Sequence, residues 1–577
     1  MPLSFQSFPK PVVLVCAIAL GMSQATAGLG QSQEDAGAYL SGRAALRATD
    51  YQDAAAWFAR AMLADAKNPL LLEGAVLANL GIGELDPAAQ AGKRLLSLDP
   101  KNGAGALAEF AQAARDGDFT VILDGFAAEK SMGPLLDDLI KAWAQLGAGS
   151  MADAIASFDT LAKTKGFEAF GLYHKALALA SAGDFGGAEE ILSGKAAGEI
   201  NLLRRGIVAR AQILSQLERN PDAIAMLDQV FPIGTDLEID DLRRRLAAGE
   251  PIAFDIARDA KEGISESFFS VAMGLSSGEE NPNTLIYARI AGQLRPDNAD
   301  ATLLTAELLE RQGQYPAAAD AFAAIPANHP LFNLAEIGRA DATYAAGNKE
   351  GSLEILRSLA RSHGQLINVQ IALANGLRRA EAFKEAIGAY DTAISMLPGD
   401  APGNWALYYS RGISHERAGD FPNAEADLRK ALALNPDQPQ VLNYLGYTLV
   451  DRGENLTEAL GMIERAVAGQ PDSGYIIDSL AWAYFRLGRY QDALAPMEQA
   501  SLLEPVDPIV TDHLGDIYWA VGRTREAQFQ WSRALSFEPV EKDAVRIRLK
   551  LEIGLDAVLA QEGAKPLMSV ETTQNGD

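Results

Sequence analysis

The chain has 577 residues, of which 48% are apolar and 22% are charged, and its net charge at pH 7 is −26. This length exceeds what one compact core can organise, so we expect several domains or a repeat array. The excess of acidic side chains repels a phosphate backbone, and no basic stripe with interleaved aromatic residues offsets it. Nucleic-acid binding is therefore not expected. The many alanines and leucines favour helices.

The first 27 residues have the pattern of a secretory signal peptide. Lys10 is their only charge, an apolar run extends from Val12 to Leu20, and Ala25-Thr26-Ala27 is a small-x-small cleavage site. No later stretch is apolar for long enough to span a bilayer. We therefore expect residues 1–27 to be removed and the mature chain to be exported without a transmembrane span.

Cys16 is the only cysteine of the chain, and it lies inside this signal. Lipid attachment requires a cysteine at the end of the apolar run, after a small residue, whereas Val15 precedes Cys16 and most of the run follows it. We expect no lipid anchor here. Without Cys16 the mature chain has no disulfide and no thiol chemistry.

A period of about 34 residues runs through most of the chain. It is marked by alanines that open an apolar helix three or four residues after a turn, and most of their intervals are 34 or close to a multiple of it. This period is typical of helix–turn–helix hairpins, which bury their apolar faces only by stacking on neighbours. The alanines are Ala54, Ala88, Ala154, Ala188, Ala223, Ala318, Ala386, Ala424, Ala459, Ala493 and Ala527.

In chain order, the period predicts two arrays of hairpins. The N-terminal array, residues 35–237, consists of degenerate units that start near residues 35, 69, 103, 135, 169 and 204, and the unit near 103 carries Ile122 in place of its alanine. The C-terminal array, residues 265–541, has units that start near residues 265, 299, 333, 367, 405, 439, 474 and 508. The last five follow the pattern most closely.

The segment 238–264 interrupts the period. It contains the charged run from Asp241 to Leu246 and then the turn Gly249-Glu250-Pro251. Two interpretations stay open at this point. The segment is either an irregular helical connector, built as an atypical helix pair that kinks or divides the array, or one diverged repeat.

The final hairpins carry a fixed pattern of small, aromatic and turn residues. Gly446 and Gly515 are small where two helices must approach closely, and Gly453 suits the left-handed conformation that ends a helix. Prolines close each unit because they cannot continue a helix. In the last unit the pattern reads Leu514-Gly515-x-x-Tyr518, Gly522, Ala527-x-x-x-Trp531, Ala534 and Pro539.

This pattern resembles the tetratricopeptide repeat (TPR) family. The resemblance implies an all-α fold, a right-handed α-α superhelix of about 13–14 hairpins with an irregular central segment. Past Pro539, residues 542–561 form an amphipathic pattern, with Val545, Leu549 and Ile553 on its apolar face. We expect one capping helix there, followed by a disordered tail over residues 562–577.

Motifs for chemistry are not found. The five histidines are not at metal-ligand spacing, and there is no P-loop, no GxSxG elbow and no HExxH motif. We therefore expect no cofactor, no metal and no enzyme activity. A hydrolytic site assembled across several repeats is the remaining alternative.

In the TPR family, the first helices line a concave groove through positions 2, 5, 9, 12 and 13 of each repeat. The resemblance therefore implies a groove for a protein or peptide partner in the last three repeats. Packing of the aromatic rings between repeats is the alternative. The family's basic carboxylate clamp is not carried over, because position 5 is acidic in the last two repeats. The predicted groove residues are Asn443, Tyr447, Asp478, Trp482, Phe485, Arg486, Asp512, Asp516 and Trp519.

The whole layout is similar to exported TPR scaffold and adaptor proteins of Gram-negative bacteria. That resemblance implies a periplasmic scaffold that binds a protein or peptide, with peripheral association to the outer membrane left open. The alternative is a structural component of an envelope assembly for polysaccharide or protein export. The sequence identifies neither the partner nor the oligomeric state.

Overall fold

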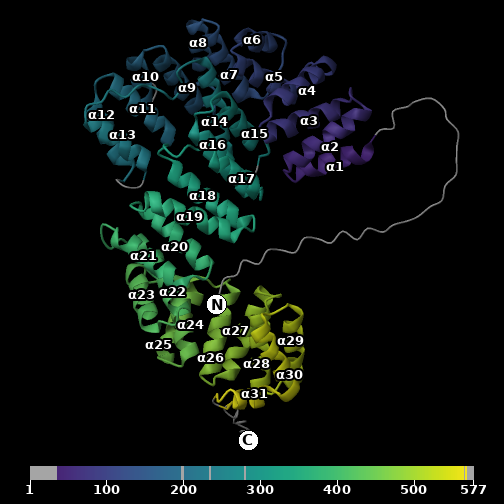
Figure 1. Ribbon diagram of the computed structural model, residues 1–577, viewed down its shortest axis with the longest axis vertical. Coiled ribbons are helices and arrows are strands. Elements are labelled where there is room, and N and C mark those ends of the chain that lie inside the picture. The colour runs from purple at the N-terminus through teal and green to yellow at the C-terminus, as the bar shows by residue number, and fades with distance from the viewer. Residues whose placement is uncertain (1–34, 196–200, 233–235, 279–280, 565, 568–577) are drawn as a thin grey trace, which may run out of the picture. The chain divides into compact units, whose positions relative to one another are not determined.

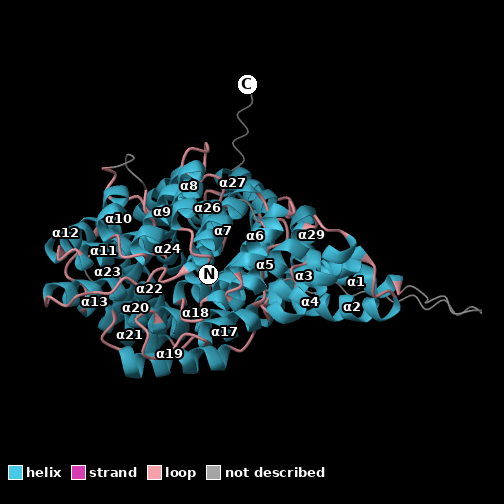
Figure 2. Ribbon diagram, turned by 90° about the horizontal axis from the view of Figure 1, so that it is seen from above, coloured by secondary structure: helices cyan, strands magenta, loops and turns pink. Residues whose placement is uncertain are grey.

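The computed structural model describes residues 35–195, 201–232, 236–278, 281–564 and 566–567. Within these residues the chain forms 31 α-helices and one short 3-10 helix, and it contains no strand (Figure 2). The predicted all-α fold is confirmed. The predicted signal peptide and most of the predicted tail lie outside the described residues. None of the described helices has the length and hydropathy needed to cross a bilayer.

The chain divides into two compact units, and each is described by itself. Unit 1 comprises Met1–Phe231 and Arg243–Ala301, and unit 2 comprises Pro232–Leu242 and Thr302–Asp577. Both units are built of helical hairpins, in which a first helix packs against the second helix that follows it (Figure 1).

Unit 1 begins with six consecutive hairpins. Their first helices begin at the predicted residues or one residue away, and the weakly predicted unit near residue 103 is also a hairpin, with Ile122 buried. The hairpins are α1 (Ala36–Arg47) with α2 (Tyr51–Ala64), α3 (Pro69–Ile82) with α4 (Leu85–Leu98), α5 (Gly103–Asp116) with α6 (Phe119–Ala127), α7 (Pro134–Gly147) with α8 (Met151–Leu161), α9 (Glu168–Ser181) with α10 (Phe185–Leu192), and α11 (Arg204–Gln216) with α12 (Asn220–Val230).

The segment that interrupts the period contains one helix, α13 (Leu237–Ala247), and a non-helical stretch over residues 248–259. It is an irregular connector, but neither a helix pair nor a diverged repeat. Ile252 in the non-helical stretch is buried, and its backbone N–H donates to Ser215 Oγ of α11 at 2.9 Å. Side-chain contacts to α11 thus replace the helical hydrogen bonds that this stretch lacks.

A further hairpin follows, formed by α14 (Ala260–Ser276) and α15 (Asn283–Leu294). It does not continue the stack of hairpins in sequence order. Instead, α14 packs against α7 and α9, and α15 packs against α3 and α5 (Figure 1). Unit 1 therefore extends to Ala301, whereas the sequence placed the start of the second array at residue 265.

Unit 2 continues as a regular stack of hairpins. The helices that begin at residues 367, 405, 439, 474 and 508 start where the period predicts. The helices are α16 (Ala299–Arg311), which crosses the boundary between the units, α17 (Tyr315–Ala323), α18 (Phe332–Ala345), α19 (Lys349–His363), α20 (Ile367–Arg379), α21 (Phe383–Ser395), η1 (Pro402–Asn404), α22 (Trp405–Arg417), α23 (Phe421–Leu434), α24 (Pro439–Arg452), α25 (Leu456–Gly469), α26 (Gly474–Arg486), α27 (Tyr490–Leu503), α28 (Pro508–Ala520) and α29 (Thr524–Ser536).

The repeat glycines act as the sequence predicts. A Cβ on Gly446 would lie 2.7 Å from the Ile463 side chain, and one on Gly515 would lie 2.4 Å from the Trp531 ring, so both positions must be small. Gly453 ends α24 with φ of 69°, in the left-handed region where a side chain is strained. The close approach of the two helices and the end of the first helix thus depend on residues within the same hairpin.

The C-terminal end differs from the predicted single capping helix. Residues 541–561 form two helices, α30 (Glu541–Ile553) and α31 (Leu555–Gln561), separated at Gly554 with φ of 80°. Val545 and Ile553, which the sequence placed on the buried face, are 53% and 38% exposed. The buried face of α30 instead carries Ile547 and a fully buried lysine, Lys550.

Candidate partner-binding faces

The first helices of neighbouring hairpins contact one another directly and form one face of each unit, which we call the first-helix face. In unit 1 these contacts join α1 to α3, α3 to α5, α7 to α9 and α9 to α11. In unit 2 they join α18, α20 and α22, and then α24, α26 and α28. All nine predicted groove residues lie on the last three of these helices: Asn443 and Tyr447 on α24, Asp478, Trp482, Phe485 and Arg486 on α26, and Asp512, Asp516 and Trp519 on α28.

The accessible part of this face lies where α24 meets α26. Arg486 is exposed, and its guanidinium donates to the Asp451 carbonyl at 3.1 Å and lies 3.6 Å from the Asp451 carboxylate. Tyr447 is half-buried, and burial together with the charges of Asp478 and Asp451 raises the pKa of its hydroxyl. Asn443 is also half-buried, and its Oδ1 has no hydrogen-bond partner among the described residues. This part of the face offers a ring, an amide and an ion pair.

Trp482 packs between repeats. Its ring stacks on Phe485 with centroids 4.8 Å apart and on His513 of α28 with centroids 4.0 Å apart. Phe485 is only 8% exposed. The packing alternative therefore describes both rings, although Trp482 remains half-buried and part of its surface is accessible.

Asp478 lies beneath these rings and is fully buried. Its Oδ1 is 2.9 Å from His513 Nδ1. Burial by itself lowers the pKa of His513, but the carboxylates of Asp478, Asp512 and Asp516 outweigh it, so the pKa is raised. His513 is thus held by Asp478 and stacks on the face of Trp482.

The two aspartates of α28 are paired with a lysine of the C-terminal helix α30. Lys550 Nζ lies 2.7 Å from Asp512 Oδ2 and 2.6 Å from Asp516 Oδ1, and the lysine is fully buried. Trp531 Nε1 donates to the same Asp516 oxygen at 2.9 Å. Burial and the charge of Asp516 raise the pKa of Asp512, against the opposing effect of Lys550. Within the structure these carboxylates bind an ammonium group from α30.

Trp519 is half-buried and packs against the C-terminal helices. Its Nε1 donates to Asp556 Oδ2 of α31 at 2.8 Å, and its ring packs against Trp531 with centroids 5.4 Å apart. Arg546 of α30 binds Glu562, just past α31, at 2.8 Å. The α28 part of the first-helix face is therefore occupied by α30 and α31, which leaves the α24–α26 part accessible.

Lys550, Arg546 and His513 were not among the residues that the sequence predicted for this site. A signal for two of them is present, because Lys550 lies 34 residues after Asp516 (550 − 516) and Arg546 lies 34 residues after Asp512 (546 − 512). They therefore take the positions of a first helix in a further repeat. His513 lies on the first helix α28, and its ring is paired with Asp478.

Arginines lie on the face upstream of α24. Arg379 of α20 pairs with Asp341 of α18 at 2.6 Å. Arg378 lies close enough to Tyr409 of α22 to oppose the rise that burial causes in the pKa of that hydroxyl. Its hydrogen bond is to Tyr390 Oη at 3.4 Å, and no carboxylate of the described chain lies within ion-pair distance of it. The α20–α22 part therefore presents a guanidinium that has no counter-ion among the described residues.

The first-helix face of unit 1 is occupied by α14 and α15. A Cβ on Gly263 of α14 would lie 2.2 Å from the Trp143 ring of α7. Ser270 Oγ of α14 is 3.0 Å from His174 Nε2 of α9, and both residues are buried. In this unit a helix of the same chain lies where the family is expected to hold a guest.

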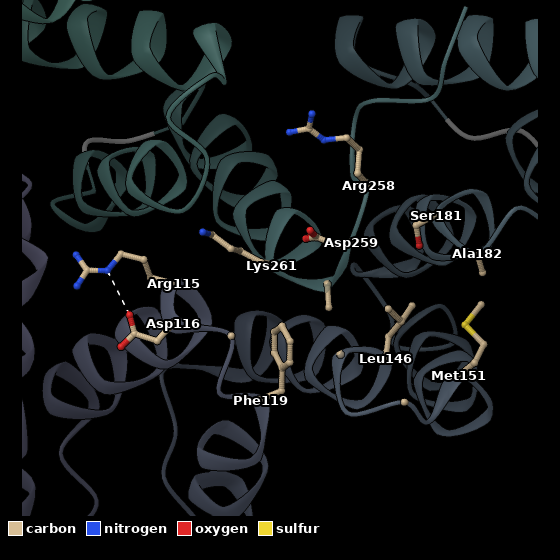
Figure 3. A pocket seen from close by; sticks show the side chains of 14 residues that line it. Arg115, Asp116, Phe119, Leu146, Met151, Ser181, Ala182, Arg258, Asp259 and Lys261 are labelled. Atoms are coloured by element: carbon tan, nitrogen blue, oxygen red, sulfur yellow. Dashed lines mark ion pairs between the residues drawn. The ribbon is translucent and has the colours of Figure 1, made fainter.

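A cavity of about 640 Å³ lies at the N-terminal end of α14, in unit 1 (Figure 3). The turns between α5 and α6, α7 and α8, and α9 and α10 contribute to its wall. Its cationic residues are Arg115, which pairs with Asp116 at 3.7 Å, Arg258 and Lys261. Over the described residues, no three His, Cys, Asp or Glu side chains are grouped so that they could hold a metal ion.

Stacked helical hairpins, without a strand in the described ranges, define a helical repeat protein of the solenoid class. A family model described as tetratricopeptide repeat matches residues 285–331, 371–439, 409–474 and 445–508. The chain therefore contains tetratricopeptide repeats over these residues, and the predicted resemblance to that family is confirmed there.

Similar proteins cover only parts of the chain. A TPR repeat-containing protein of Pseudomonas aeruginosa is 32% identical over 189 residues, which are 32% of this chain and 31% of that protein. Mouse superkiller complex protein 3 is 33% identical over 103 residues, which are 18% of this chain and 6% of that protein. The chain thus spans less than a third of the length of either relative.

Solved structures of similar fold include the APC/C hetero-tetramer Cut9–Hcn1, with 15% identity and a TM-score of 0.37 over 91% of this chain and 96% of that chain. Yeast Tom70 has 14% identity and a TM-score of 0.35 over 92% of this chain and 96% of that chain.

Proposed function

We propose that the chain is a non-enzymatic periplasmic scaffold that binds a protein or peptide on the first-helix face of unit 2, between α18 and α26. The tetratricopeptide repeats support the scaffold role, since TPR proteins are protein-interaction modules. The signal-peptide pattern of residues 1–27 supports export. The α28 part of the face is excluded from the proposed site because α30 and α31 cover it.

The observation that carries the proposal is the position of α14 in unit 1. This helix is bound along the first-helix face and is buried there over most of its length. The corresponding face of unit 2, from α18 to α26, is built of the same type of helix. Among the described helices of unit 2, only α30 and α31 cover part of the first-helix face. They cover the α28 part, which lies outside the range from α18 to α26. A face that binds a helix in one unit is well suited to bind a partner segment in the other.

The chemistry of the α24–α26 part suggests how a partner is held. The half-buried rings of Tyr447 and Trp482 offer apolar contact to a partner side chain. The Arg486–Asp451 pair is exposed and can exchange partners with a charged side chain. Rings provide affinity here, and the ion pair provides register and orientation.

The test is affinity capture from extract of the source cells, with Arg486→Glu as the main variant. Charge reversal there places two acidic groups together on the face, so we expect captured partner to fall at least about tenfold, as for loss of an interfacial charge pair. Gln499→Glu, at an exposed position on the second helix of the same hairpin, is the control and should leave capture unchanged. Equal capture by both variants, or loss with both, contradicts the proposal.

A further inference from the structure

The helix α14 is buried to an unusual depth for a helix rich in polar residues. All eleven residues from Glu262 to Ala272 are buried. Five of them, Glu262, Ser265, Glu266, Ser267 and Ser270, are polar. A permanent core is mostly apolar, whereas an interface that forms and separates is more polar. The composition of α14 is that of an interface.

The contacts of α14 with the first helices are specific. Glu266 accepts hydrogen bonds from Tyr173 Oη of α9 at 2.8 Å and from Arg205 Nε of α11 at 2.7 Å, and it is 2% exposed. Three residues earlier, Gly263 permits close approach to Trp143. Four residues later, Ser270 bonds to His174. One stripe of α14 therefore matches one line of side chains across α7, α9 and α11.

The companion helix α15 is less well satisfied. Thr284 Oγ1 and Arg289 Nε are buried without a hydrogen-bond partner in the described chain. Burial lowers the pKa of Arg289, and no carboxylate lies within ion-pair distance of it among the described residues. Each such group costs free energy while the hairpin is docked and regains water when the hairpin leaves. The packed position of α15 therefore leaves buried polar groups without hydrogen-bond partners among the described residues.

The hairpin is attached at its base. The chain before it is fixed to α11, because Gln212 bonds to the Asp255 backbone at 3.0 Å and to its carboxylate at 2.7 Å. Arg295, at the end of α15, donates to the Ile256 carbonyl at 2.8 Å. The cavity of Figure 3 lies beside this base, where Arg258 to Lys261 line its wall, so the start of α14 has open space on one side.

We propose that the hairpin of α14 and α15 can leave the first-helix face of unit 1. When it has left, this face binds an acidic partner helix in its place. The partner helix carries a small residue against Trp143. A glutamate three positions later reaches Tyr173 and Arg205, and a hydroxyl four positions after that reaches His174. This face is a second binding site, separate from the site proposed on unit 2.

The first experiment measures binding of a labelled synthetic peptide with the sequence of residues 258–277 to the full chain by fluorescence anisotropy. Gly263→Ala pushes a methyl group into the Trp143 ring and weakens docking, so the variant should bind the peptide at least about tenfold more tightly than wild type. Gly274→Ala is the matched control. The same methyl group on the same helix meets only Phe170 at 3.5 Å, so affinity should stay at the wild-type level.

Two results of this experiment overturn the proposal. One is equal binding by Gly263→Ala and Gly274→Ala. The other is unchanged binding when the peptide carries Glu266→Gln, which removes the charge that meets Arg205. With the proposed contacts, that peptide should bind at least about tenfold more weakly.

Hydrogen exchange of the wild-type chain keeps the proposal testable if Gly263→Ala impairs folding. Displacement requires α14 and α15 to open without unfolding of the hairpins around them. Their amides should therefore exchange at least about tenfold faster than those of α7 and α9. Equal rates for the four helices would show that α14 leaves only when unit 1 unfolds, which overturns the proposal and leaves the site on unit 2 unaffected.

Discussion

His174 illustrates how single residues define this structure. Trp143 Nε1 donates to His174 Nδ1 at 3.1 Å. Ser270 Oγ, 3.0 Å from Nε2, donates its own hydrogen to the Ser267 carbonyl at 3.2 Å. His174 Nε2 must then carry the proton and Nδ1 must accept, which is the neutral form. A second proton on Nδ1 would face the Trp143 N–H and break the relay. Burial accordingly lowers the pKa of His174 to about 3.

Acid should therefore weaken unit 1 through this residue. The unfolded chain binds a proton at His174 near pH 6.5, whereas the folded chain does not, so stability is complete above pH 6.5 and declines as the pH falls toward the folded pKa. Between pH 6.5 and 5 the loss is about 2 kcal/mol. Native-state hydrogen exchange of α7 and α9 at the two pH values measures it. In His174→Gln this part of the pH dependence should disappear, and an undiminished dependence would contradict the assignment.

In unit 2, replacement of the buried Lys550 should lower the stability of the fold. Lys550→Met leaves two buried carboxylates without their ammonium partner, although Arg546 still lies 3.6 Å from Asp516. We expect the free energy of unfolding to fall by about 3–5 kcal/mol, the usual cost of breaking a buried pair from one side. Urea unfolding followed by tryptophan fluorescence measures it. Lys542→Met, at an exposed position of the same helix, is the control and should change stability by less than about 0.5 kcal/mol.

At the scale of elements, the sequence predicts the hairpins closely and the exceptions poorly. The starts of α24, α26 and α28 are correct because prolines, glycines and small residues act within one hairpin. The start of α14 was predicted five residues too late (265 against 260), and its place on α7 and α9 was missed. That place depends on Gly263 meeting Trp143, a contact between residues 120 positions apart (263 − 143). No local pattern encodes such a contact.

The cap is the second exception, and it is open to test. Leu555 and Val558 of α31 are buried, and Asp556 holds the Trp519 indole. Deletion of residues 554–577 should shift tryptophan emission to longer wavelength and lower the stability of unit 2 by about 3 kcal/mol or more, because the buried contacts of two apolar side chains are lost. Deletion of residues 568–577 alone should do neither. Equal behaviour of the two deletions would show that α31 does not cap the repeats.

At the scale of the whole molecule, the chain uses its first-helix faces in two ways. In unit 1 the face holds α14 and α15, and in unit 2 the helices that the structure describes cover only the α28 end. Both occupants use charged contacts: Glu266 meets Arg205, and Lys550 meets Asp512. The repeat thus presents carboxylates or guanidinium groups according to position, which lets one fold select partners of different charge.

This arrangement explains which candidate site residues could be predicted. The family register correctly places Tyr447 and Arg486 on the first-helix face, because position within a hairpin determines the face. It cannot show that Asp512 and Trp519 are covered, since the covering residues Lys550 and Asp556 belong to helices outside the predicted repeats. Partner binding by the accessible residues stays a prediction.

The most direct test of partner binding on unit 2 is photo-cross-linking in the source cells. A photoreactive amino acid replaces Asp451, Arg486 or the exposed Gln499 of α27 in separate variants. We predict that one and the same protein cross-links at Asp451 and Arg486, is displaced by excess unlabelled chain, and does not cross-link at Gln499. Cross-links that are the same at all three positions, or absent from the first two, would contradict a partner site on this face.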